Sequence, residues 1–198
     1  MDNDVKFNAK KSHAMFVTCK DHNRLVFPDF YLCGTKLEVC KETRYLGHFF
    51  TEDLCDDRDI YRQCRKLYAQ GNTLCRKFHM CSHGVKIALF RAYCTPLYTA
   101  HLWCRYKKGS LRKLIVAYND AMRMLLQLPR HSSASRMFAD AHVPSCQAVV
   151  RNLTFKFIER IDISENDIVN ILVNPMKSCT RYTSELWKRW YDNLLAES

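Results

Sequence analysis

The fold is decided between residues 56 and 80, where the chain reads DDRDIYRQCRKLYAQGNTLCRKFHM. Apolar or small residues recur there at every third or fourth position, which is the period of a helix with one buried face. They are Ile60, Cys64, Leu67, Gly71, Leu74 and Phe78. Asp53, Asp56 and Asp57 supply caps and a favourable first-turn charge. The pattern predicts a long helix from these aspartates to about Met80, with its apolar stripe facing a core.

The polar side of this predicted helix is basic. Polar residues follow the same spacing but are displaced by two positions, or about 200° around the helix axis, so they are expected to face solvent. They are Arg58, Arg62, Arg65, Asn72 and Arg76.

The whole chain carries a formal net charge of +11. Such a charge favours a polyanionic partner, with nucleic acid as the first candidate and an acidic membrane surface as the second. Excess lysine and arginine can also simply keep a chain in solution, and charge alone does not separate these explanations.

More helices are expected downstream. Residues 85–103 are apolar almost all round, which is typical of a central helix in a bundle, and Pro96 should kink or divide it. A helix at residues 111–128 should be stopped by Pro129. Shorter helices are expected at 134–141, 145–161 and 164–172, the last capped by Ser164. A final helix is expected from Thr183, with an aromatic stripe made by Leu186, Trp187, Trp190, Tyr191, Leu194 and Leu195.

The first fifty residues have a different texture, with short stretches of strand-forming residues. A strand is expected at residues 14–19, a hairpin at 30–39 around Gly34 and Thr35, and a third strand at 44–51. So few strands bury little surface, so this sheet should need a neighbour. The predicted fold class is therefore α+β, mainly α, with a small antiparallel hairpin sheet packed on a helical bundle. The expected division is a sheet at 1–51, a bundle at 52–173, and a linker with a C-terminal amphipathic helix at 174–198.

Composition excludes several classes of protein. Hydrophobic residues make up 47% of the chain, which is typical of a folded protein. The first ten residues are polar, and no apolar run approaches the roughly 18 residues of a membrane-spanning helix. We therefore expect a nuclear or cytoplasmic protein that is not secreted and has no membrane partner. The eleven cysteines are odd in number, which favours reduced, mostly buried thiols over a disulfide framework.

Four short motifs follow one another along the chain between residues 8 and 123. Asn8, Lys11 and Ser12 form an Asn-x-x-Lys-Ser segment before a strand, and Tyr45-Leu46-Gly47 follows about thirty residues later. Downstream come FRAYCTPLY at residues 90–98 and YNDAMR at residues 118–123. In this order the motifs make nearly the whole chain similar to the palm rim and thumb of a non-LTR (LINE-type) retrotransposon reverse transcriptase.

This resemblance implies roles for particular residues. Tyr45, Leu46 and Gly47 would form the primer grip, which holds the 3′ end of the growing strand. Lys11 would be the palm lysine that assists departure of pyrophosphate. The arginine face would track the backbone of an RNA–DNA or DNA primer–template, and the missing palm and fingers segment would be a second partner. The alternative is that Lys11 is an ordinary solvated lysine and that Tyr45 is a strand residue packed in the sheet.

The same resemblance predicts that the chain does not polymerise alone, because the metal-binding aspartates of the family's palm do not precede Lys11. No cofactor is expected for this fragment, and Mg²⁺ is expected only with a complete palm. Two acidic stretches imitate the missing site. The pair Asp56 and Asp57 is better explained as a helix cap, and Phe138-Ala139-Asp140-Ala141 lacks a second aspartate and lies in a helical region.

Cysteines and histidines at residues 75–83 raise the possibility of a zinc site. Four possible ligands, Cys75, His79, Cys81 and His83, fall within nine positions. They lack the Cys-x-x-Cys knuckle that is usual for structural zinc, so no metal site is predicted.

The preferred function is nucleic-acid binding inherited from an RNA-directed DNA polymerase. The alternative is a non-enzymatic helical interaction or structural protein derived from a transposable element.

Overall fold

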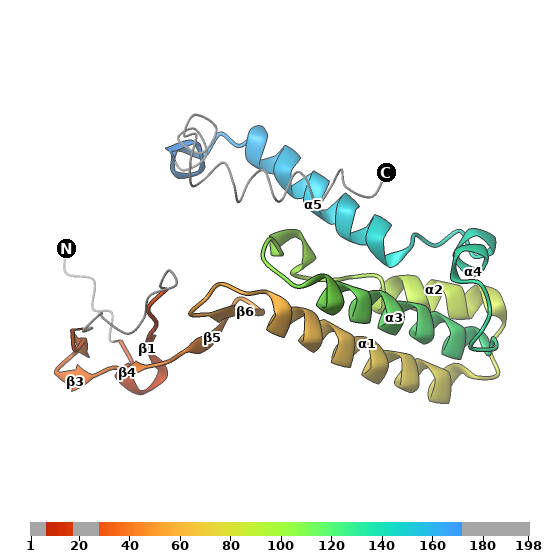
Figure 1. Cartoon of the computed structure of the whole chain (residues 1–198), viewed down its shortest axis with the longest axis horizontal. Coiled ribbons are helices and arrows are strands. Elements are labelled where there is room, and N and C mark those ends of the chain that lie inside the picture. Colours follow the sequence, from red (N-terminus) through yellow and green to blue (C-terminus); the bar gives the residue numbers. More distant parts are fainter. Residues whose placement is uncertain (1–6, 18–27, 172–198) are drawn as a thin grey trace. The chain divides into compact units, whose positions relative to one another are not determined.

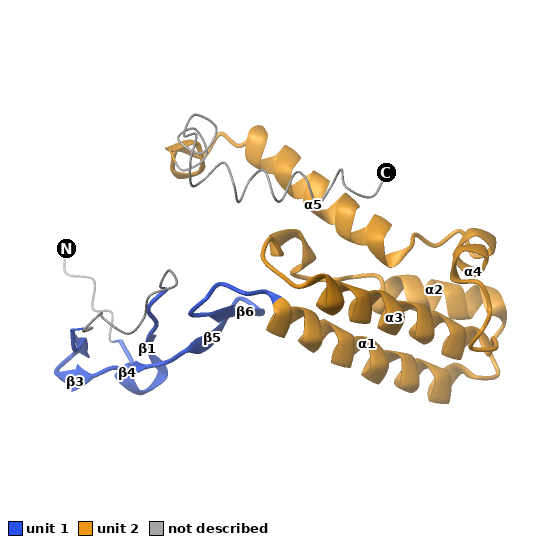
Figure 2. Ribbon diagram, viewed as in Figure 1, with its two compact units in different colours: residues 1–56 blue, residues 57–198 orange. Residues whose placement is uncertain are grey.

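The computed structural model describes residues 7–17 and 28–171. It divides into two compact units, residues 1–56 and residues 57–198 (Figure 2). Short strands make up the described part of the first unit, and helices make up that of the second (Figure 1). The fold is thus α+β with helix dominant, as the sequence predicts. The linker and final helix expected at 174–198 lie outside the described residues.

The second unit is built on α1 (Asp57–Phe78), which follows the predicted stripe. Ile60 and Leu67 are almost completely buried, and so are Leu114 and Tyr118 on α3 (Lys108–Leu126). The two helices approach closely at Gly71, where an added Cβ would lie 3.2 Å from Met124 Cε and 3.3 Å from Ala121 Cβ. A residue without a side chain therefore lets α1 and α3 pack together around one core.

The predicted division at Pro96 is confirmed. α2 (His83–Tyr93) ends just before it, and the amide groups of Cys94 and Thr95 both donate to the carbonyl of Phe90, at 2.9 and 3.2 Å. Proline has no amide hydrogen to continue the helix, so the chain leaves it and forms the short 3₁₀ helix η3 (Ala100–Leu102). Leu97 and Trp103 remain in the core.

α3 ends two residues earlier than predicted, and its stop is not Pro129. Gln127 adopts the left-handed conformation, with φ of 57°. The amide of Leu128 then donates to the carbonyl of Arg123 at 2.9 Å, and that of Gln127 to Met124 at 3.2 Å. This is the Schellman arrangement, which here uses glutamine where glycine is usual.

Two of the later helices agree with prediction to within one residue, and the helix expected at 164–172 begins three residues later. α4 (Ala134–Asp140) and α5 (Cys146–Asp162) are capped by the hydroxyl groups of Ser133 and Ser145. Residues 167–171 are helical as well, but the cap differs from the prediction. The side-chain oxygen of Asn166, not that of Ser164, accepts from the amides of Ile168 and Val169.

The first unit contains a short 3₁₀ turn, η1 (Ala9–Lys11), and very short strands. Its described strands form three two-stranded ladders in place of the single antiparallel sheet that was expected. The pairs are β1 (His13–Ala14) with β4 (Glu38–Val39), β2 (Tyr31–Leu32) with β3 (Thr35–Lys36), and β5 (Glu42–Tyr45) with β6 (His48–Thr51). The first pair is parallel and the others are antiparallel. The hairpin around Gly34 is confirmed. Residues 44–51, expected as a single strand, contain the end of β5, a turn and all of β6.

The cysteines among the described residues are thiols outside any disulfide, but the prediction that most are buried is wrong. Only Cys64, Cys94 and Cys146 are buried among the residues the structure describes. Burial raises the pKa of Cys94 to about 11 and that of Cys146 to about 12, because a thiolate is poorly solvated in the core.

Within the described residues, none of the helices combines the length and apolar character needed to cross a bilayer.

Candidate nucleic-acid interface

The Tyr45-Leu46-Gly47 motif forms the tip of the β5–β6 hairpin. Tyr45 pairs with His48, and both residues between them have positive φ, 47° for Leu46 and 85° for Gly47. This left-handed pair is typical of a two-residue hairpin turn, where asparagine-glycine is the usual choice. Leucine has a Cβ that disfavours the conformation by about 1–2 kcal/mol. An apolar residue is therefore held at the tip against its backbone preference.

The side chains at this tip face solvent. Tyr45 is 64% exposed and Leu46 is 76% exposed. The Tyr45 ring lies 6.5 Å from that of Phe50, centroid to centroid, in a tilted arrangement. Tyr45 is therefore a strand residue, as the alternative has it, but most of its side chain is exposed and is not packed inside the sheet. The tip therefore presents one aromatic and one aliphatic side chain to solvent.

Lys11 lies at the end of η1, and its side chain is exposed. The neighbouring motif residues have local structural roles. The Asn8 side chain accepts from the amide of Lys10 at 3.1 Å, and the Ser12 hydroxyl donates to the carbonyl of Asn8 at 3.0 Å. The Asn-x-x-Lys-Ser segment is thus a self-capped turn that leads into β1, with its lysine presented to solvent.

The basic face of α1 is largely as predicted. Arg58, Arg65, Asn72 and Arg76 are exposed. From Arg58 to Arg76 the face extends about 27 Å, at about 1.5 Å per residue. Because all four belong to one helix, their spacing along this face is fixed by the helix itself.

Arg62 is the exception to the predicted basic face. Its side chain is only 19% exposed, and its Nη2 atom lies 2.7 Å from Asp59 Oδ1. Nε donates to the same carboxylate oxygen at 2.8 Å, and Nη2 reaches the hydroxyl oxygen of Thr99 at 3.3 Å. Arg62 therefore neutralises a buried charge, and its position on the helical wheel alone did not reveal this.

The buried partner is Asp59, whose side chain has no exposed surface. Its second oxygen accepts from Trp103 Nε1 at 2.9 Å and from the hydroxyl of Thr99. The carboxylate therefore connects the first turn of α1 to the segment around η3. The sequence did not reveal this role because an aspartate in a first helical turn is usually explained by the helix dipole, and because Thr99 and Trp103 lie about forty residues away.

Two more arginines donate hydrogen bonds to backbone carbonyls within the helical unit. Arg91 Nη2 donates to the carbonyls of Ala141 and His142, at 3.1 and 2.8 Å. Arg123 donates to the carbonyl of Ser132 through Nε and Nη2, at 3.2 and 3.0 Å. Both arginines come from the two downstream motifs. The positive charge that can meet a ligand is therefore smaller than the formal count suggests.

The same motifs supply the aromatic core. Phe90 and Tyr118 are fully buried, with ring centroids 5.0 Å apart in an edge-on arrangement. The Tyr118 hydroxyl donates to the carbonyl of Pro144 at 3.1 Å, and burial raises its pKa. At residues 90–98 and 118–123, the resemblance thus rests in part on residues that build the core.

Exposed tyrosines flank the basic face, a feature that the sequence analysis missed. Tyr61 and Tyr68 are both about 40% exposed on α1. Lys113 Nζ lies 3.2 Å from the Tyr61 hydroxyl and 4.9 Å from its ring centroid. Hydrogen bonding with Ser110 and Lys113 lowers the pKa of Tyr61. The repeat Tyr61, Arg65, Tyr68, Asn72 was the available signal, because its spacings of four and three place all its members on adjoining parts of one helix surface.

No family model, curated protein or solved structure matches this chain. The likeness to reverse transcriptases therefore stays a prediction carried by the motifs.

The acidic pair Asp56 and Asp57 has structural roles. Asp56 is buried, with Oδ1 3.4 Å from His48 Nε2. Asp57 accepts from the backbone amide of Lys107 at 2.9 Å, so it satisfies an amide next to the start of α3. Interpreting the pair as structural is consistent with these contacts, and Asp57 also lies in the first turn of α1, where a negative charge was expected.

The cysteine–histidine cluster near the end of α1 does not converge. Cys75 directs its thiol to the carbonyl of Met124 on α3, at 3.6 Å. In the part of the chain that the structure describes, no group of three or more cysteine, histidine or acidic side chains is placed to hold a metal ion.

Proposed function

We propose that this chain binds nucleic acid through the sugar–phosphate backbone, as the palm rim and thumb of a retrotransposon reverse transcriptase would. The ligand class is an RNA–DNA or DNA primer–template. RNA-templated DNA synthesis would require the palm aspartates and their Mg²⁺ ions, supplied by a longer product or by a partner chain. Binding itself requires only the residues described above.

The observation that carries this proposal is the exposed row Arg58, Arg65 and Arg76 on one face of α1. A guanidinium group donates two parallel hydrogen bonds to phosphate oxygens and keeps its charge at any working pH. Contacts of this kind fix the position of a nucleic acid without reading its sequence. A row about 27 Å long is suited to follow several consecutive phosphates.

The first unit supplies a second, separate set of contacts. Tyr45 and Leu46 offer exposed apolar surface at the hairpin tip, which suits the sugar and base of a strand end. Gly47 has no side chain to obstruct close approach of a backbone. Lys11 adds an exposed ammonium group. We assign the primer end to this hairpin and the duplex backbone to α1.

The test is the salt dependence of binding to a blunt RNA–DNA hybrid, measured by fluorescence anisotropy between about 50 and 200 mM salt. The variant Arg58→Gln/Arg65→Gln/Arg76→Gln should flatten the slope of log affinity against log salt by about two to three units, at about 0.9 per phosphate contact. A control that removes as much charge from α4 and α5 is Arg136→Gln/Lys156→Gln/Arg160→Gln. Its slope should match that of the original chain, and equal slopes for the two variants would refute the proposal.

A protein-interaction function is favoured by a different observation. Phe155, Ile163, Ile168 and Ile171 are exposed on α5 and the segment that follows it. Apolar side chains of this size suit a protein partner. This function predicts a stable oligomer whose mass, measured by light scattering, does not change between low and high salt, together with weak retention on heparin.

A further inference from the structure

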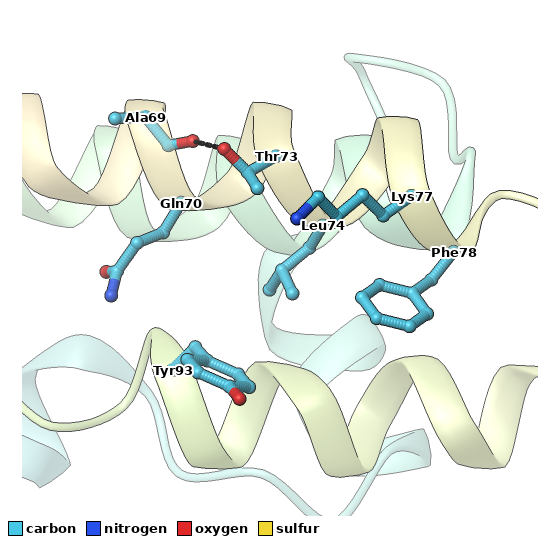
Figure 3. Close-up of a pocket in the computed structure, with 7 residues that line it drawn as sticks. All are labelled: Ala69, Gln70, Thr73, Leu74, Lys77, Phe78 and Tyr93. Carbon is cyan, nitrogen blue, oxygen red and sulfur yellow. Dashed lines mark hydrogen bonds between the residues drawn. The ribbon is translucent and has the colours of Figure 1, made fainter.

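A pocket of about 350 Å³ opens between α1 and α2. Gln70, Leu74 and Phe78 extend from α1 toward α2, and the ring of Tyr93 lies across the gap from them (Figure 3). Tyr93 is half exposed, so part of its ring remains available to a ligand. The volume lies within the range of pockets that hold small ligands.

We propose that this pocket receives one unpaired nucleotide of a bound strand, with its base between Tyr93 and the apolar side chains of α1. The inference rests on the proposed nucleic-acid function and adds a preference for a single-stranded extension. A base has two apolar faces, which suit Tyr93, Leu74 and Phe78. Its edge carries donors and acceptors, and the Gln70 amide can supply both kinds of partner.

The charge around the pocket is complementary to a phosphate. Arg76, Lys77 and Thr73 line an adjoining hollow of about 270 Å³. Two cations thus lie beside the base site, and none of the described side chains that line either hollow is acidic. The phosphate on the sugar of the bound nucleotide would be attracted to these cations.

Continuity with the basic face points to the same ligand. Arg76 is both the last arginine of the exposed row on α1 and a lining residue of the adjoining hollow. A strand that follows Arg58 and Arg65 along α1 therefore arrives at the pocket. Duplex bases are stacked and cannot enter it, so the nucleotide that does must be unpaired.

The test compares a blunt RNA–DNA duplex with the same duplex carrying a short single-stranded extension. The unmodified chain should bind the extended duplex at least about five times more tightly, since stacking one base on an aromatic side chain raises affinity by about that factor or more. The variant Tyr93→Ala/Lys77→Gln should lose this ratio. The control Tyr98→Ala/Lys156→Gln removes an exposed tyrosine and lysine outside the pocket and should keep it. Circular dichroism melting checks that each variant folds.

The possible results separate the two proposals. Equal affinity of the unmodified chain for blunt and extended duplexes overturns the pocket assignment and leaves backbone binding intact. An extension advantage that survives Tyr93→Ala/Lys77→Gln also overturns it. Absence of salt-dependent binding to either duplex refutes both proposals. A Tyr93-dependent affinity for an acidic amphipathic peptide, without any extension advantage, would make the pocket a peptide site and end the nucleotide assignment.

Discussion

Replacing Asp59 by alanine removes the acceptor on which several core donors converge. The carboxylate is fully buried and accepts from Arg62, from Trp103 and from the Thr99 hydroxyl. In the variant, the indole N–H of Trp103 loses its acceptor while it stays buried. Arg62 retains its 3.3 Å contact with Thr99 and some access to water.

The size of the effect follows from this geometry. Breaking a buried ion pair by removing one partner destabilises a protein by about 3–5 kcal/mol. Because Arg62 keeps partial solvation, we place the loss for Asp59→Ala near the lower end, at about 3 kcal/mol. Arg62→Ala should cost less, about 2 kcal/mol, because Asp59 keeps Trp103 and Thr99 as donors.

Urea denaturation of the two single variants and the double variant measures this network. Because the residues contact each other, the double variant should be more stable than the sum of the two losses predicts, by about 1–3 kcal/mol. Arg62→Ala should also leave the salt dependence of nucleic-acid binding unchanged, since its guanidinium is held by Asp59. A loss below about 1 kcal/mol for Asp59→Ala, or additive losses, would refute the assignment of a buried ion pair.

Further predictions concern the core of the second unit. Gly71→Val should lower stability by about 1–3 kcal/mol in urea unfolding, because even a Cβ would meet Ala121 at 3.3 Å; an unchanged midpoint would contradict the close packing. Gln63→Met should raise stability by about 1 kcal/mol, because the buried Gln63 Nε2 has no hydrogen-bond partner among the described residues. Stability should fall as pH rises from about 9 towards 12, because burial raises the pKa of Cys94 to about 11 and that of Cys146 to about 12, so the unfolded chain loses these protons first. Replacing both thiols by alanine should flatten this part of a pH–stability curve, and an equally steep curve would contradict it.

The parts of the fold that the sequence could predict are those governed by local rules. The period of α1 follows from its apolar residues, and the break after Tyr93 follows from the chemistry of Pro96. The serine caps of α4 and α5 also act over a few residues. The positions of Arg65 and Arg76 were predictable because a helix fixes which side each residue faces.

The parts that could not be predicted depend on contacts between distant residues or on unusual backbone. The link from Asp59 to Trp103 spans more than forty residues, so no local pattern reveals that Arg62 is held inside. Leu46 and Gln127 adopt left-handed conformations that their side chains disfavour. The pocket of Tyr93 exists only because α1 and α2 lie side by side (Figure 3).

The most direct test of the account is a titration of the arginine side-chain N–H signals by NMR while a blunt RNA–DNA duplex is added. The signals of Arg58, Arg65 and Arg76 should shift together and saturate at one duplex concentration. Those of Arg91 and Arg123, which already donate to backbone carbonyls, should stay in place. Shifts spread evenly over all arginines, or none on α1, would contradict the claim that this helix face holds the phosphate backbone.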